Sequence, residues 1–254
     1  MLARGIEAAW QRPAKRARLT RAGSTEALRC SRRANMAENR YSAETLIVGM
    51  RELMRTIPEL FIIESLTLED EKAGRQEGEL ISRMLRLGGK TRTQYYYIRT
   101  EVELEEMIDL FDESNYRYLH ISCHANSHGM ALTFGDLSFS KLAGMLNPCL
   151  EDRRVFVSAC EMANESLAAA ILRETGCYSL IGPKRSIRFS DAAAFWVAFY
   201  HLIFKANKLS MKRETLRRRI TELSAIFEEP INYFASSSTA KQGYTRVRNR
   251  TRVR

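Results

Sequence analysis

"YLHISCHANSHGMAL", residues 118–132, contains three of the four histidines of the chain, at positions 120, 124 and 128. The apolar run YRYLHIS, residues 116–122, is typical of a buried strand that ends just before His124. Histidines four residues apart share a face only on a helix, whereas His120 lies in the strand-like run and ANSHG is turn-like. The even spacing therefore does not favour a metal site at His120, His124 and His128.

A second apolar run, RRVFVSAC at residues 153–160, is also strand-like and ends at Cys160. Strand and helix patterns alternate from about residue 60 to residue 227, which predicts an α/β sandwich with a mostly parallel sheet. Strands are expected at 60–66, 93–100, 116–122, 153–160 and 177–182, with a hairpin at 130–139; helices are expected at 42–57, 78–89, 101–113, 140–146, 164–175, 190–207 and 211–227.

Parallel strands present their carboxyl ends at one edge of the sheet, where functional groups gather. His124 and Cys160 each follow a predicted strand, and 36 residues separate them (160 − 124), which fits one crossover connection. An imidazole beside a thiol can take its proton, and the resulting thiolate can attack a carbonyl carbon. The residues alone leave this dyad open, because a lone cysteine after a strand is usually buried as a small hydrophobe.

Three blocks in order resemble the CHAT domain family, a caspase-like group related to caspases, separase and the gingipains. The first is YLHISCHANSHGMAL, the second is VFVSACEMA at 155–163, and the third is SLIGPKRSIRFSDAAAFWVAFYHLI at 179–203. The resemblance covers roughly residues 60–205. It implies a caspase-like three-layer α/β/α sandwich with a mostly parallel central sheet, and a cysteine endopeptidase activity directed at proteins.

The resemblance also implies roles for particular residues. His124 would be the general base and acid, Cys160 the nucleophile, and the backbone N–H groups of Ala125 and Cys160 the oxyanion hole. The family usually has glycine after the histidine, where this chain has Ala125, and alanine restricts the backbone more than glycine does. The dipeptide His128-Gly129 imitates the family pattern as well, so His128 is the alternative base.

Substrate recognition is assigned to two residues by the same resemblance. Ser158, two residues before the nucleophile, would line the first specificity pocket. Asp191 would favour a basic residue before the scissile bond, although a carboxylate here can instead cap the following helix, as can Ser190. The aromatic residues Trp196, Phe199, Tyr200 and Phe204 recur at helical spacing and are expected in the core.

Charge divides the 254 residues into three parts. The net charge of +10 is concentrated at the ends, because residues 1–40 carry ten Lys/Arg and three Glu, and residues 241–254 carry six Lys/Arg and no acid. We expect a basic, disordered N-terminal segment at 1–40, a caspase-like domain at 41–234 and a basic, disordered tail at 235–254. Nucleic-acid binding through these ends is a minor alternative.

The five cysteines, Cys30, Cys123, Cys149, Cys160 and Cys177, are odd in number and irregularly spaced, and no secretory signal precedes them. This favours reduced thiols in a cytoplasmic protein rather than a disulfide framework. No CxxC pair is present and no cofactor motif was found, so neither a metal nor a cofactor is expected.

The sequence therefore predicts a cytoplasmic cysteine endopeptidase with a Cys-His dyad. Relatives in the family are often switched on by a partner and many act in bacterial defence, so an activating protein partner is expected from the resemblance alone. The alternative is a catalytically inactive interaction or signalling module on the same fold. The oligomeric state and the natural substrate are left open.

Overall fold

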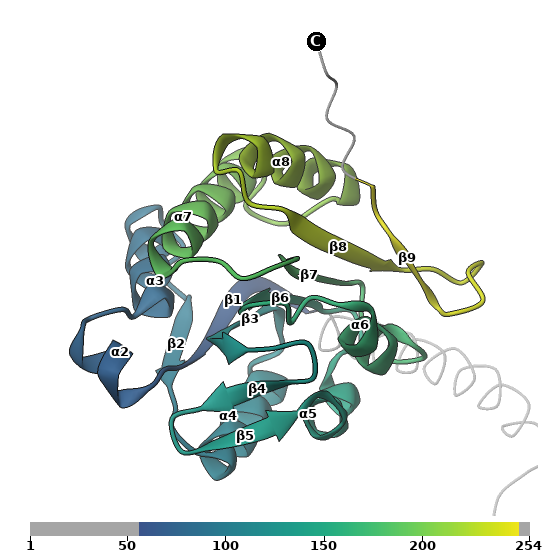
Figure 1. Ribbon diagram of the computed structural model, residues 1–254. Coiled ribbons are helices and arrows are strands. Elements are labelled where there is room, and N and C mark those ends of the chain that lie inside the picture. Colours follow the sequence, from purple (N-terminus) through teal and green to yellow (C-terminus); the bar gives the residue numbers. More distant parts are fainter. Residues whose placement is uncertain (1–55, 249–254) are drawn as a thin grey trace, which may run out of the picture. The chain divides into compact units, whose positions relative to one another are not determined.

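The computed structural model describes residues 56–248. The predicted N-terminal segment, and all but the last two residues of the predicted helix at 42–57, lie outside the described residues. Thr56 is not helical and Ile57 begins the first strand. The described chain forms a nine-stranded sheet (Figure 1). Seven strands follow the order β2-β1-β3-β6-β7-β8-β9, and the other two, β4 and β5, form a hairpin that pairs with β3.

Five neighbouring strands of this sheet, from the edge strand β2 to β7, are parallel. They are β2 (Gln94–Tyr97), β1 (Ile57–Ser65), β3 (Tyr116–Ala125), β6 (Arg154–Ser158) and β7 (Ser179–Pro183). β1, β3, β6 and β7 are buried over most of their length, as expected for parallel strands covered on both faces. The predicted strands at 60–66, 93–100, 116–122, 153–160 and 177–182 are thus confirmed.

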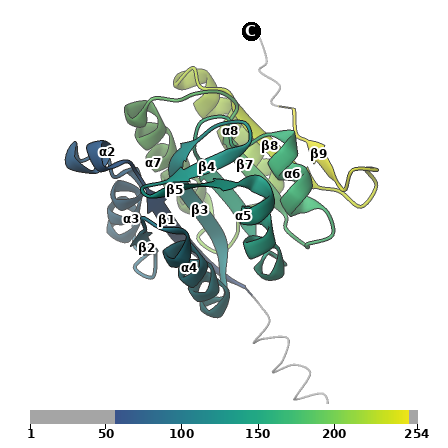
Figure 2. The same cartoon turned by 60° about the horizontal axis from the view of Figure 1, so that its bottom comes forward.

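Helices cover both faces of the sheet (Figures 1 and 2). Two separate cores result, because one set of helices packs on each face. The first set is α4 (Glu101–Ser114), α5 (Phe139–Leu146) and α6 (Glu165–Leu172), and the second is α3 (Glu77–Leu87), α7 (Phe189–Ala206) and α8 (Arg213–Ile226). The predicted three-layer α/β/α sandwich is confirmed.

The second core is built largely from the aromatic residues of α7. Trp196, Phe199, Tyr200 and Phe204 are all buried there, as their spacing predicts. Phe156 on β6 contacts three of these rings, with centroids 5.6 to 6.0 Å apart. This packing fixes α7 against the strand that leads to Cys160.

Short elements complete the edge at which the parallel strands end. The hairpin consists of β4 (Gly129–Leu132) and β5 (Gly135–Ser138), and the short helix α2 (Leu68–Lys72) follows β1. β3 is longer than expected, because His124 and Ala125 pair with Ala131 and Met130 of β4. A turn of 3₁₀ helix, Asn147–Cys149, precedes β6.

The end of the chain differs from the sequence-based expectation. Two antiparallel strands, β8 (Ile231–Ser236) and β9 (Tyr244–Arg246), extend the sheet where a disordered tail from residue 235 was expected. The chain is small, polar and basic only from residue 235, whereas most of β8 is apolar and buried, and β9 adds the buried Tyr244. The rings of Phe234 and Tyr244 pack edge to face at 5.8 Å. Residues 249–254 lie outside the described part of the chain.

Candidate active site

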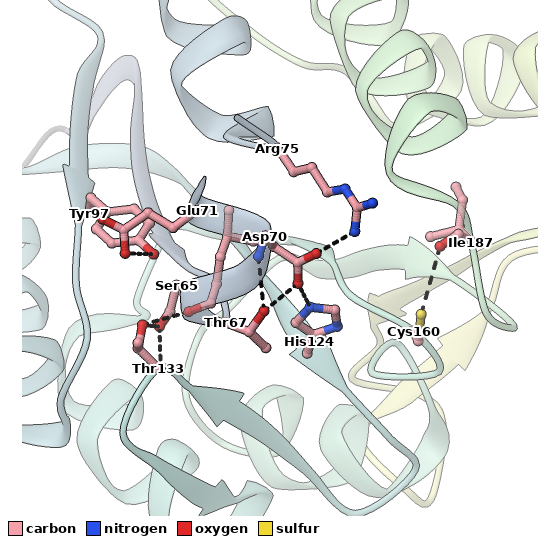
Figure 3. A network of polar contacts seen from close by, with 11 residues as sticks. Ser65, Thr67, Asp70, Glu71, Arg75, Tyr97, His124, Thr133, Cys160 and Ile187 are labelled. Carbon is pink, nitrogen blue, oxygen red and sulfur yellow. Dashed lines mark hydrogen bonds and ion pairs between the residues drawn. The ribbon is translucent and has the colours of Figure 1, made fainter. Parts of the chain in front are cut away.

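Two neighbouring strand ends carry the candidate dyad. In the β3–β6 register Ser122 lies opposite Ser158, so His124 and Cys160 each stand two residues beyond a paired position. The parallel crossover thereby brings His124 and Cys160 to the same edge of the sheet (Figure 3). The predicted juxtaposition of the two residues is present. Their side chains share no hydrogen bond among those found in residues 56–248, and each has another partner.

The imidazole of His124 is held by a carboxylate that the sequence reasoning missed. His124 Nε2 lies 2.6 Å from Asp70 Oδ2, and Asp70 sits in α2, 54 residues earlier. The Thr67 hydroxyl donates to the same oxygen at 2.7 Å, and Arg75 Nη1 donates to Oδ1 at 2.5 Å. Burial opposes ionisation of Asp70, but the hydrogen bonds from Thr67, His124 and Arg75 prevail and lower its pKa below the usual range.

Thr67 shows how the local sequence places this carboxylate. It is the N-cap of α2, and its side chain accepts a hydrogen bond from the Asp70 N–H at 3.2 Å. The spacing Thr-x-x-Asp is a helix-start pattern, so TLED at 67–70 predicts the cap. It gives no sign that Asp70 contacts a histidine, because that contact depends on how α2 packs against β3.

A ring contact holds the other side of the imidazole. The Phe189 ring, in the first residue of α7, packs edge to face against His124 with centroids 5.3 Å apart. The Arg75 guanidinium also lies over Phe189, at 5.6 Å from the ring centroid. His124 is therefore positioned by α2 and α7, while its ring remains partly accessible, with 39% of the side chain exposed.

Cys160 lies in a tight turn between β6 and α6. The next residue, Glu161, has a positive φ of 58°, and the Met162 N–H donates to the Ala159 carbonyl at 3.4 Å. Asn164 closes the turn, since its Nδ2 donates to the Glu161 carbonyl at 2.9 Å. The Cys160 sulfur itself lies 3.9 Å from the Ile187 carbonyl oxygen (Figure 3).

Exposure distinguishes Cys160 from the other thiols of the described chain. Cys123, Cys149 and Cys177 are buried, and Cys160 is partly exposed. Burial raises the pKa of Cys123 far above its usual value, that of Cys149 to about 11 and that of Cys177 to about 12. These three thiols stay protonated at neutral pH and are unsuited to nucleophilic attack. Cys123, although next to His124 in the sequence, is a core residue, as expected.

The backbone conformation at the position after the candidate base is compatible with alanine. Ala125 is in β3 and pairs with Met130, so its backbone is extended and does not have a positive φ. Glycine is needed only where φ is positive or where a Cβ would clash. The restriction expected from alanine in place of glycine therefore does not arise in this conformation.

A buried acidic cluster lies next to Ser158. The Ser158 hydroxyl donates to Glu77 Oε2 at 2.8 Å, and the Ser122 hydroxyl lies 3.5 Å from the same oxygen. Burial raises the pKa of Glu77 to about 8, and it also raises the pKa of nearby Glu64. The side chain of Ser158 is thus directed into this cluster and is only 5% exposed, so in this conformation it does not face solvent.

The remaining predicted site residues fall in different places. His120 is fully buried and its Nδ1 lies 2.9 Å from the Tyr200 hydroxyl, while burial lowers its pKa to about 3, so it is neutral. His128 is exposed in the β3–β4 turn, where its Nδ1 lies 2.9 Å from the Ser127 hydroxyl. Asp191 lies in the first turn of α7, but neither it nor Ser190 is the N-cap, since Arg188 holds that position.

Comparison with known proteins places this geometry in a family. The family model of the CHAT domain matches residues 7–222. The chain belongs to the CHAT domain family. No curated protein matches this CHAT protein.

Two solved structures are similar to it. A secreted C11 cysteine protease from Bacteroides thetaiotaomicron, in complex with an irreversible peptide inhibitor, matches with a TM-score of 0.50 at 8% identity over 70% of this chain. The Arg-specific cysteine proteinase gingipain R matches with a TM-score of 0.46 at 12% identity over 69% of this chain. The CHAT chain covers 66% of the first protein and 44% of the second, less than two thirds of either. The family model shows the family, and the likeness to the first structure shows a shared fold.

Residues 56–248 contain neither a cluster of side chains suited to a metal ion nor a membrane-spanning helix. No group of three or more His, Cys, Asp or Glu side chains there could hold a metal ion, so His120, His124 and His128 do not form a metal centre. Within the same residues, no helix is both long enough and apolar enough to cross a membrane.

Proposed function

We propose that this CHAT protein is a cysteine endopeptidase in which Cys160 is the nucleophile and His124 the general base and acid. The observation that carries the proposal is the hydrogen bond between His124 and Asp70 beside a partly exposed Cys160 at the same sheet edge. This is the arrangement in which a base is oriented by a third group, which holds the ring in one tautomer. Asp70 is accordingly a positioning residue.

The hydrogen bonds of His124 define which nitrogen takes part. Because Asp70 is ionised and can only accept, Nε2 carries the proton and donates it, which leaves Nδ1 as the acceptor in the neutral ring. Nδ1 takes the Cys160 proton, and the thiolate attacks the peptide carbonyl carbon. His124 then gives this proton to the leaving amine, and a thioester remains on Cys160. Water attacks the thioester and releases the carboxylic acid and the thiol.

The backbone N–H of Ala125 supports the proposed oxyanion hole. The neighbouring Asn126 N–H donates to the Gly129 carbonyl, and antiparallel pairs alternate between bonded and non-bonded. The Ala125–Met130 pair is therefore the non-bonded type, and the Ala125 N–H points away from β4. β4 runs toward the end of β1, where Thr133 contacts Ser65, so this N–H points to the β6 side, which carries Cys160. A donor on that side suits a developing oxyanion.

Substrate recognition and activation are the finer parts of the proposal. Asp191 is half-exposed two residues after Phe189, which contacts His124, and it remains our candidate for recognising a basic residue before the scissile bond. Ser158 would line the same specificity pocket only if its side chain turned toward solvent, because its hydroxyl donates a hydrogen bond to Glu77. Such a rearrangement, with alignment of Cys160 toward His124, is the step that an activating protein partner would supply.

An electrophilic peptide probe tests the assignment. We expect covalent labelling of Cys160 in the full chain, located by mass spectrometry, and its loss in Cys160→Ala and in His124→Ala. His128→Ala is the matched control, since His128 is an exposed histidine of the adjoining turn, and it should label at the native rate. Equal loss in His128→Ala would contradict the assignment of the base. No labelling of the native chain, even with a partner present, would favour the non-catalytic interaction module.

A further inference from the structure

A large basic cavity lies at the same sheet edge as Cys160 but outside the candidate active site. Its volume is about 1020 Å³, and it is enclosed by the segment after β7, the end of α8, the start of β8 and the residues after β9. Pro183 at the end of β7 pairs with Ile231 at the start of the antiparallel β8. The cavity therefore lies where the parallel strands end. Figure 1 shows the course of β7, α8 and β8, whose residues or following segments line it.

Positive charge dominates the cavity wall. Lys184, Arg185, Arg246 and Arg248 line it, with Glu228 as the single lining acid. Among the described residues, Lys184 and Arg248 have no ion-pair partner, and both are exposed. Residues 56–248 as a whole carry 25 basic and 25 acidic side chains, a net charge of zero. Arg185 is paired with Glu229 at 3.8 Å, and the other three cations still give the cavity wall a local excess of positive charge, which attracts an anionic ligand.

The cavity is connected to the turn that carries Cys160. Arg246 Nη2 donates to the Asn232 Oδ1 atom at 2.6 Å, and Asn232 Nδ2 donates to the Ala163 carbonyl at 2.8 Å. On the other side, Lys184 begins the segment that reaches Ile187, whose carbonyl oxygen lies 3.9 Å from the Cys160 sulfur. A chain that occupies the cavity thus approaches the nucleophile within a few residues.

We propose that this cavity is a substrate subsite for an acidic segment of the polypeptide, a few residues from the scissile bond. This inference rests on the proposed function, because the ligand is a substrate only if the protein is a peptidase. Besides the cations, the cavity is lined by the apolar Pro230, Ile231 and Val247. A segment in which Glu or Asp alternates with apolar residues matches both kinds of lining, whereas a phosphate ion matches only the cations.

Binding to the Cys160→Ala full chain tests the subsite without turnover. The probe is a fluorescein-labelled peptide of alternating Glu and Val, compared by anisotropy with its Gln–Val counterpart. Lys184→Glu and Arg248→Glu should each weaken binding of the Glu peptide by about fivefold or more, the scale of a lost ion pair with an added repulsion. Arg218→Glu makes the same change of charge on α8 at a side chain that is 59% exposed and outside the cavity lining, and should leave binding nearly unchanged.

Three results would overturn the subsite. One is equal binding of the Glu and Gln peptides, and another is an equal effect of all three substitutions, which would reflect general attraction to a basic protein. The third is displacement by inorganic phosphate at an ionic strength where chloride has no effect, which would identify a phosphate site instead. The binding assay uses Cys160→Ala, which has no thiol to label. Its result is therefore independent of the labelling experiment that tests catalysis.

A second experiment tests whether the cavity affects the rate at which Cys160 reacts with a substrate-like probe. Electrophilic probes that carry the Glu–Val or the Gln–Val extension are compared for their rate of labelling the native chain. We expect the acidic probe to react about fivefold faster, and this advantage to disappear in Lys184→Glu. Equal rates, with labelling otherwise intact, would refute the subsite and leave the peptidase assignment standing.

Discussion

Asp70 receives hydrogen bonds from a hydroxyl, a guanidinium and an imidazole. Together these bonds determine the tautomer of His124, the residue that supplies the imidazole. The low pKa of Asp70 keeps it ionised, so it can only accept from His124 Nε2. The carboxylate also needs its donors for its own burial, since only 8% of its side chain is exposed. At the scale of single residues, the proposed site therefore has three members, Asp70, His124 and Cys160, rather than two.

Replacement of this carboxylate tests its positioning role. Asp70→Asn can accept from only one oxygen and no longer fixes the tautomer of His124. We expect the labelling rate of Cys160 to fall by about 10- to 100-fold. With a turnover substrate, kcat should fall while KM changes little. Because partial unfolding would give the same split, the rate is referred to the folded fraction measured by circular dichroism, and Asp70→Glu, which keeps the carboxylate, should recover part of it. Native labelling in a folded Asp70→Asn protein would remove Asp70 from the site.

The turn between β6 and α6 is the element on which the nucleophile depends. Asn164 Oδ1 accepts the Leu167 N–H and so caps α6, while its Nδ2 donates to the Glu161 and Ser127 carbonyls. One side chain therefore joins the helix, the turn of Cys160 and the turn of His128. The relative position of the two turns therefore depends on the hydrogen bonds of Asn164.

Two substitutions separate these roles of Asn164. Asn164→Ala removes the cap and should lower the free energy of unfolding by about 1 kcal/mol. Asn164→Asp keeps a capping oxygen but loses both donated bonds, so it should retain most of the stability. Both variants should label more slowly at Cys160. Ser138→Ala, which uncaps α5, serves as the control in urea unfolding, and it should lose stability without loss of labelling. Native labelling in Asn164→Asp would show that the two donated bonds do not hold the nucleophile.

For the whole molecule, the buried Glu77 makes stability depend on pH. An unfolded glutamate ionises near 4.5, whereas folded Glu77 keeps its proton to about pH 8 because it is buried beside Glu64. Between these values the folded state binds more protons, so a rising pH destabilises the fold. The decrease amounts to at most about 1.4 kcal/mol per pH unit.

Glu77→Gln removes this titration. The difference in urea-unfolding free energy between the variant and the native chain should shift in favour of the variant as the pH rises from 5 to 8. Comparison with the variant cancels the titration of the other groups. Parallel pH profiles for the two proteins would contradict a protonated Glu77 in the fold.

The end of the chain gives a second prediction for the whole molecule. A chain ended after residue 248 keeps β9, and one ended after residue 240 loses it together with the buried Tyr244. The shorter chain should lose about 2 kcal/mol of unfolding free energy, the scale of one buried aromatic side chain. Chemical denaturation of both truncations checks this, and equal midpoints would contradict a packed β9.

Much of this architecture could be predicted along the chain. The runs at 116–122 and 153–160 are apolar and short, so their burial as strands follows from composition. The aromatic spacing of α7 likewise predicted its buried face. The C-terminal strands escaped prediction because β9 has three residues and few apolar side chains, and it is stable only when paired with β8.

The sequence by itself determined the α/β order, and it placed His124 and Cys160 at the ends of two strands. It did so because hydrophobic periodicity and strand ends are local properties of the chain. Only the tertiary structure decided that Asp70 holds His124, that Ala125 lies in an extended strand and that four cations share one cavity. Those contacts join residues that lie far apart in the sequence, and they form only because the packed sheet brings α2 to β3 and β9 to the end of β7.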